Sequence, residues 1–275
     1  MRRRDLVGLL GLAGCGRSSS EGTRVIQVRG SETLLPLMQR WAVFYGERCG
    51  QVVSVGGGGS GTGIAGLLNG TVDVAMASRA IHQEERSKLA RRGVLLERVV
   101  ALDAISLYVH PSNPVREVSL EALREVFVGR QRSWTFLGGG AAPIATYSRE
   151  NSSGTYAYFK EQVLKNQDLA PWVQCLPGTG SVVRAVSQNP KALGYGGAIA
   201  GGKVGVLAVR RGSGEAIAPS SRTAQDGSYP LARPLHVYVR GDAPEEARAF
   251  VRWLGSTEAQ ELAERTGFFP VGAEA

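Results

Sequence analysis

The residues from Arg149 to Thr155 place a guanidinium shortly before a helix start, a combination suited to binding an anion. They read Arg-Glu-Asn-Ser-Ser-Gly-Thr, follow an apolar run typical of a strand, and precede a helical pattern over residues 156–165. The first amides of a helix have no partner within it and the helix dipole is positive there, so Ser153, Gly154 and Thr155 could hold an anion. Arg149 could donate to two oxygens of one tetrahedral anion. The same residue types are common in turns and N-caps, which leaves a purely structural role open.

A glycine-rich stretch at 56–63 repeats this arrangement earlier in the chain. It follows a predicted strand at 51–55 and opens a helical pattern at 64–68. A third such turn, at 30–33, comes after an alternating strand pattern at 24–29. Repeated strand-turn-helix units predict mostly parallel sheets with helices on both faces.

The predicted units are too many for one simple sheet. The two glycine-rich helix starts each lie in their own run of units, which favours two similar α/β lobes. We expect residues 24–103 together with 230–275 to form the first lobe, and residues 104–229 to form the second. The two helix starts would then lie opposite each other in the cleft between the lobes.

The N-terminus has the pattern of an exported lipoprotein. Arginines at positions 2–4 precede an apolar core at 6–13, which is too short to span a bilayer as a permanent helix. The small residues before Cys15 resemble a bacterial lipobox. We expect residues 1–14 to be a cleaved signal peptide, Cys15 to be the lipidated first residue, and 15–23 to be a flexible tether. An ordinary secretory leader with an incidental cysteine is the alternative.

The composition indicates a globular, basic protein. Its 32 Lys and Arg outnumber its 24 Asp and Glu, for a formal net charge of +8, which suits an anionic ligand. The basic residues are scattered and do not interleave with aromatic residues, so nucleic-acid binding is not expected. With three histidines and no CxxC pattern, neither a zinc site nor a cofactor is expected. Cys49 and Cys175 should be free, buried thiols.

Five segments, taken in order, resemble the phosphate-binding proteins of ABC-type phosphate importers, members of the type II periplasmic-binding-protein superfamily. They are residues 30–36 (GSETLLP), 59–63 (GSGTG), 73–79 (ending in Ser-Arg), 113–115 (NPV) and 149–155. Each segment alone is weak evidence, whereas all five in this order are specific. The resemblance runs over most of residues 24–270.

The resemblance implies a ligand held between two lobes by three helix starts and an arginine of the second lobe. Carried over position by position, it implicates Thr33, the Leu34 backbone, Ser60, Arg149, Ser153, Gly154 and Thr155. It also implies a monomeric binding protein that delivers inorganic phosphate to ABC permease subunits in the membrane and performs no chemistry. With Cys15 lipidated, the protein would be extracytoplasmic and anchored to the bacterial cell envelope.

Two positions depart from the best-known members of the family. Asn151 and Arg79 stand where aspartates are often found. Phosphate at neutral pH still carries a proton that needs an acceptor, and sulfate does not, so sulfate or another tetrahedral oxyanion stays open as the ligand. Glu32, Glu150 or a backbone carbonyl could supply the acceptor. Arg79 could add a second guanidinium to the site, or it could make a structural salt bridge.

Two other functions are alternatives. A phosphate-sensing protein without a transport role has the same site, and the sequence does not separate the two. A hydrolase would use Ser60 or Ser153 as its nucleophile, but none of the histidines at positions 82, 110 and 236 lies near a Gly-x-Ser-x-Gly elbow in triad order. We therefore expect a binding protein and not an enzyme.

Overall fold

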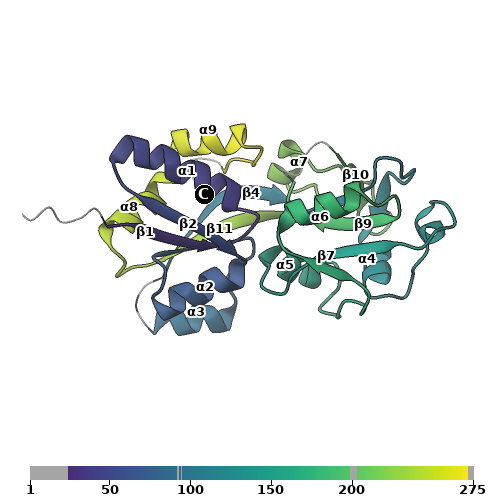
Figure 1. Cartoon of the computed structure of the whole chain (residues 1–275), viewed down its shortest axis with the longest axis horizontal. Coiled ribbons are helices and arrows are strands. Elements are labelled where there is room, and N and C mark those ends of the chain that lie inside the picture. Colours follow the sequence, from purple (N-terminus) through teal and green to yellow (C-terminus); the bar gives the residue numbers. More distant parts are fainter. Residues whose placement is uncertain (1–23, 92, 94, 199–202, 272–275) are drawn as a thin grey trace, which may run out of the picture.

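The computed structural model describes residues 24–91, 93, 95–198 and 203–271, which form two α/β lobes (Figure 1). The first lobe has a five-stranded sheet in the order β2-β1-β3-β11-β4. Its strands are β1 (Ile26–Gly30), β2 (Val53–Gly58), β3 (Val74–Ala77), β4 (Leu95–Ala104) and β11 (Ala232–Arg240). Its helices are α1 (Leu35–Cys49), α2 (Ser60–Asn69), α3 (Gln83–Ala90), α8 (Glu245–Trp253) and α9 (Thr257–Arg265).

The first lobe has a separate hydrophobic core on each face of its sheet. Because side chains alternate along a strand, Val74 and Met76 of β3 belong to the core under α1, α8 and α9, where Trp41 is also buried. Ala75 and Ala77 belong to the core under α2 and α3. Figure 1 shows these two groups of helices on opposite sides of the sheet. Helices therefore cover both faces of the first sheet.

The second lobe has a six-stranded sheet in the order β6-β10-β5-β9-β7-β8. Its strands are β5 (Ser106–Val109), β6 (Glu117–Ser119), β7 (Ala145–Arg149), β8 (Gln174–Leu176), β9 (Ala192–Gly196) and β10 (Gly205–Arg210). Its helices are α4 (Leu120–Phe127), the 3-10 turn η1 (Trp134–Leu137), α5 (Gly154–Gln162), α6 (Gly178–Ser187) and α7 (Ser221–Gln225). Phe159 of α5 stacks on Tyr195 of β9 with ring centroids 3.8 Å apart, which packs α5 against the sheet.

Both sheets are mixed, with parallel strands at the helix-opening turns and antiparallel strands near the crossing between lobes. β1 pairs in parallel with β2 and β3, and β7 pairs in parallel with β8 and β9. β11 runs antiparallel to both β3 and β4. The antiparallel pairing arises because β4 leads directly into the second lobe and β11 brings the chain back beside it (Figure 1). The lobe boundaries that we expected from the sequence remain a prediction.

The cysteine expectation was half wrong. Cys49 and Cys175 are free, as expected, but both are exposed. Cys49 is the last residue of α1, and Cys175 lies on β8, the edge strand of the second sheet. A helix end and an edge strand each leave positions that face solvent, and separation in the sequence does not reveal this. Within the ranges described, no helix is long and apolar enough to cross a membrane, and no cluster of His, Cys, Asp or Glu could hold a metal ion.

Candidate anion-binding site

Arg149 is a buried cation without a carboxylate partner. It is the last residue of β7 and is 1% exposed. Its Nε donates to the Leu176 carbonyl at 3.3 Å and its Nη1 lies 3.5 Å from Thr179 Oγ1. No ion pair among the described residues includes it. Burial lowers the pKa of Arg149, which means that the folded protein holds this charge at a cost that an anion could offset.

The start of α5 lies directly after Arg149. Ser153 is the N-cap, and its Oγ accepts hydrogen bonds from the amides of Thr155 at 3.2 Å and Tyr156 at 3.3 Å. Gly154 is the first helical residue and, like Ser153 and Thr155, it is buried. The predicted turn therefore brings Arg149 and a buried helix start together, as an anion site requires.

Hydroxyl groups of the first lobe form a buried chain at the opposite wall. Ser31 Oγ accepts from the Leu34 amide at 3.2 Å and lies 2.5 Å from Ser78 Oγ. The Ser78 amide donates to Ser60 Oγ at 3.0 Å. Leu34 and Ser60 were predicted site residues. Ser31 and Ser78 were not, although both lie within the segments that carry the family resemblance.

The two lobes contact each other at these helix starts. The hydroxyl oxygens of Thr33 and Thr155 are 3.0 Å apart, and the Gly61 amide donates to the Ser152 carbonyl at 3.1 Å. The structure thus brings Thr33, Ser60, Gly154 and Thr155 together, with Arg149, Leu34 and Ser153 beside them on the same segments. These are seven of the eight predicted ligand-binding residues.

Arg79, the eighth, is engaged elsewhere. Its guanidinium forms a two-pronged salt bridge with Glu85, with nitrogen–oxygen distances of 2.8 and 2.7 Å, and also donates to the Ala80 carbonyl at 2.9 Å. It lines a separate cavity of about 430 Å³ together with Tyr158 and His236. The structure therefore places Arg79 in a structural ion pair, and its contact with a ligand stays a prediction. Cys15 lies outside the described residues.

Arg233 is a site neighbour that the sequence reasoning missed. It lies on β11, is buried, and pairs with Asp103 of β4 through Nε at 3.0 Å and Nη2 at 2.6 Å. Nη2 also donates to Thr155 Oγ1 at 2.9 Å. A signal was present: Arg233 alternates with Leu235 and Val237, which places a charged residue on the inward face of the strand.

A cavity of about 310 Å³ opens between the lobes beside Thr33. It is lined by residues of the turn before α1 and the start of α1, of the start of α6, and of the position after β9, namely Glu32, Thr33, Leu35, Pro36, Gly178, Thr179, Gly180 and Gly197. Glu32 accepts a hydrogen bond from the Gly58 amide through Oε1. Of the two carboxylates proposed from the sequence as acceptors, Glu32 lines this cavity and Glu150 does not. The backbone carbonyl of Glu150 accepts from the Ser153 amide at 2.9 Å.

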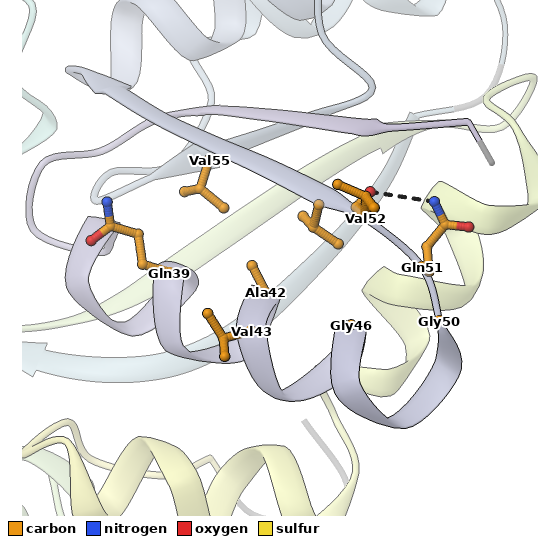
Figure 2. A pocket seen from close by; sticks show the side chains of 9 residues that line it. Gln39, Ala42, Val43, Gly46, Gly50, Gln51, Val52 and Val55 are labelled. Atoms are coloured by element: carbon orange, nitrogen blue, oxygen red, sulfur yellow. Dashed lines mark hydrogen bonds between the residues drawn. The ribbon is translucent and has the colours of Figure 1, made fainter. Parts of the chain in front are cut away.

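A second hollow of about 430 Å³ lies away from this site, between α1 and β2. Figure 2 shows Ala42, Val43, Val52 and Val55 around it. Its lining contains no charged side chain. The cleft between the lobes fits an anion better, because the buried guanidinium of Arg149 and the buried start of α5 lie there.

Comparisons with known proteins relate the chain to a family and to curated relatives. The model of the PBP superfamily domain matches residues 17–258. Protein SphX of Synechococcus elongatus is 30% identical, over 94% of this chain and 81% of its own length. The phosphate-binding protein PstS of Pseudomonas aeruginosa is 31% identical, over 89% of this chain and 82% of its own length.

Solved structures show the same fold. A phosphate ABC transporter substrate-binding protein structure from Clostridium perfringens, with bound phosphate, has a TM-score of 0.84 and 26% identity, covering 90% of this chain and 100% of its own. An ABC-type phosphate transport receptor from Vibrio cholerae has a TM-score of 0.75, 26% identity and the same coverage. The two-lobed type II periplasmic-binding fold expected from the sequence is therefore confirmed.

Proposed function

The chain belongs to the PBP superfamily, in the family of the phosphate-binding protein PstS, and from this premise we propose that it captures inorganic phosphate for an ABC importer. The observation that carries the proposal is Arg149, a buried guanidinium that lacks an ion-pair partner in the described chain and lies before the start of α5. The same helix start meets hydroxyl groups of the first lobe through Thr33 and Thr155. A tetrahedral anion matches this set of donors.

The ligand contacts that we propose are the ones carried over from the family and brought together by the fold. They are Thr33, the Leu34 amide, Ser60, Arg149, Ser153, the Gly154 amide and Thr155. A hydrogen bond to a charged group contributes about 1.5–3 kcal/mol. Several of them, less the cost of closing the lobes, are enough for a dissociation constant of about 1 μM, which corresponds to about −8 kcal/mol.

Calorimetric titration with phosphate, arsenate and sulfate tests the proposal. We expect phosphate to bind with a dissociation constant of about 1 μM or below and arsenate, a tetrahedral oxyanion of the same chemistry, to compete with it. Failure of all three anions to bind would refute the proposed function. The protein is not expected to turn over a chromogenic phosphate ester, because Ser60 and Ser153 make no hydrogen bond to a histidine in the described structure.

Sulfate or another oxyanion is the second candidate ligand. The observation that favours it is the lack of a carboxylate at positions 79 and 151, with Arg79 held by Glu85. Competition at pH 8 decides between the two, since displacement of phosphate by an equal concentration of sulfate would favour the second. The names of the relatives favour phosphate.

We further propose that the protein works outside the cytoplasm as a monomer, tethered by a lipid on Cys15 and delivering its ligand to ABC permease subunits. The support for the anchor is the lipobox-like sequence before Cys15. Labelling of cells with an alkyne-bearing fatty acid, with Cys15→Ser as the control, tests the anchor. A phosphate-sensing role without transport would instead leave phosphate uptake unchanged when the gene is deleted.

A further inference from the structure

We propose that Arg233 is a positioning residue of the anion site, which holds the Thr155 hydroxyl as a hydrogen-bond donor toward the ligand. The inference rests on the proposed function, because it takes Thr155 as a ligand contact. Arg233 lies near the start of β11, and its side chain is fully buried. No ligand role for this residue follows from the sequence motifs, since it lies outside all five of them.

Arg233 joins the two lobes at the site. Its Nη1 donates to the Ser78 carbonyl of the first lobe at 2.8 Å, and its Nη2 donates to Thr155 Oγ1 of the second lobe at 2.9 Å. Nε and Nη2 both donate to Asp103 Oδ2 on the crossing strand β4. The guanidinium also lies over the ring of Tyr158, 5.7 Å from its centroid. These contacts leave Arg233 a single orientation, with one donor directed at Thr155.

The direction of the bond to Thr155 is determined by chemistry. A guanidinium has only donors, so Thr155 Oγ1 must accept, and one of its two lone pairs is occupied. The Thr33 and Thr155 hydroxyls share one further bond of 3.0 Å. That bond uses one of their two protons, so one proton is left to donate outside the pair. When Thr33 is the donor within the pair, both lone pairs of Thr155 are filled and Thr155 can only donate to a ligand.

Asp103 neutralises the charge of Arg233, so Arg233 can affect the ligand only by orienting the Thr155 hydroxyl. Its carboxylate balances the charge of Arg233 through Oδ2 and accepts from the Ala198 amide at 2.9 Å through Oδ1. Arg149 therefore remains the site's unbalanced positive charge, and Arg233 acts on the ligand through Thr155. It follows that removal of Arg233 should matter for binding only while the Thr155 hydroxyl is present.

A double-mutant cycle on phosphate affinity tests this dependence. Because Arg233→Gln alone would leave the Asp103 carboxylate buried without a partner, the variant is Asp103→Asn with Arg233→Gln, in which two amides replace the ion pair. We expect it to weaken phosphate binding by about tenfold in the otherwise native chain, and by less than about threefold when Thr155→Val is already present. Arg248→Gln, which breaks an ion pair with Glu245 at the far end of the first lobe, is the control and should leave affinity unchanged.

Losses that add across the cycle, or a folded Asp103→Asn/Arg233→Gln variant with native affinity, would overturn the inference. If that variant melts below the assay temperature, Arg233→Lys takes its place in the same cycle, because an ammonium retains a donor and a charge for Asp103. Its loss should again disappear in the Thr155→Val background. If the native protein binds phosphate but the affinity losses of the variants are additive, only this inference is contradicted. If the native protein does not bind phosphate, the proposed function is contradicted as well.

Discussion

Gly154 packs so closely against Ser60 that a methyl group on Gly154 would lie 2.3 Å from Ser60 Oγ. These two residues begin α5 and α2, which belong to different lobes. The space that a side chain would need at position 154 is therefore taken up by the opposite lobe. A side chain at position 154 should therefore disturb the contact between the lobes without disturbing the folding of either lobe.

Gly154→Ala should weaken phosphate binding by about tenfold or more while leaving the melting temperature of the ligand-free protein near the native value. The φ angle of Gly154 is not in the left-handed region, so alanine fits the helix, and the methyl group acts only on the contact between lobes. Calorimetry and thermal melting measure the two effects. Gly140→Ala, at a position with nothing within 4 Å, should change neither, and equal affinity of the two variants would contradict the prediction.

Arg149→Met should abolish most phosphate binding and raise the melting temperature of the ligand-free protein. Burial lowers the pKa of Arg149, so the charged form that exists at neutral pH is less favourable in the folded than in the unfolded state. An apolar side chain of similar length removes that cost. We expect a loss of affinity of more than about tenfold. Unchanged affinity in the calorimeter would remove Arg149 from the site.

The exposed thiols of Cys49 and Cys175 report on lobe closure, since one lies in each lobe. With Cys15 replaced by alanine, spin labels on the two thiols should give a narrower distance distribution when phosphate is added. The physical reason is that an anion gives both lobes a common set of hydrogen bonds. In the Gly154→Ala protein, phosphate should narrow the distance distribution less. A distribution that phosphate does not change would show that the lobes do not respond to the ligand.

His236 should make the folded protein less stable below about pH 6.5. It is buried on β11, with Nδ1 3.0 Å from Glu97 Oε1, and burial lowers its pKa from 6.5 although Glu97 opposes the shift. A base whose pKa is lowered by folding binds its proton more readily when unfolded, so its contribution to stability is present above the unfolded pKa and is lost as the pH falls. Urea unfolding provides the check. The free energy of unfolding should change less between pH 8 and pH 5.5 for His236→Gln than for the native chain or for the control His110→Gln.

The helix starts and Arg149 are predictable from sequence because their signals are local. Ser153 and Gly154 are typical N-terminal helix residues, and Arg149 ends β7 shortly after the apolar run at 143–147. The start of α6 is harder to predict, because it lies at Gly178 and the glycine and threonine residues of its first turn weaken the helical signal. The mixed sheets depend on where β4 and β11 pair, and no local pattern contains that information.

Contacts between distant segments could not be predicted in the same way. Arg233 meets Thr155 across 78 positions and Asp103 across 130. Arg79 is a different case, because its partner Glu85 is only six positions away. An arginine that follows a strand fits either a ligand or a salt bridge, and the sequence does not decide between them. A charged residue on the inward face of a strand predicts a buried ion pair, but it does not identify the partner residue.

Glu32 is the proposed acceptor carboxylate that lines the cavity between the lobes, where it could distinguish phosphate from sulfate. Its carboxylate borders the cavity beside Thr33 and is held by the Gly58 amide. The hydroxyl of hydrogen phosphate needs an acceptor that sulfate does not need, and Arg233 already occupies one lone pair of Thr155. Glu32→Gln should therefore weaken phosphate binding about tenfold and leave sulfate binding nearly unchanged, so that the ratio of the two dissociation constants falls. Glu150→Gln is the matched control and should preserve the ratio. If Glu32→Gln weakened the binding of both anions equally, Glu32 would shape the site without accepting a hydrogen bond from the phosphate hydroxyl.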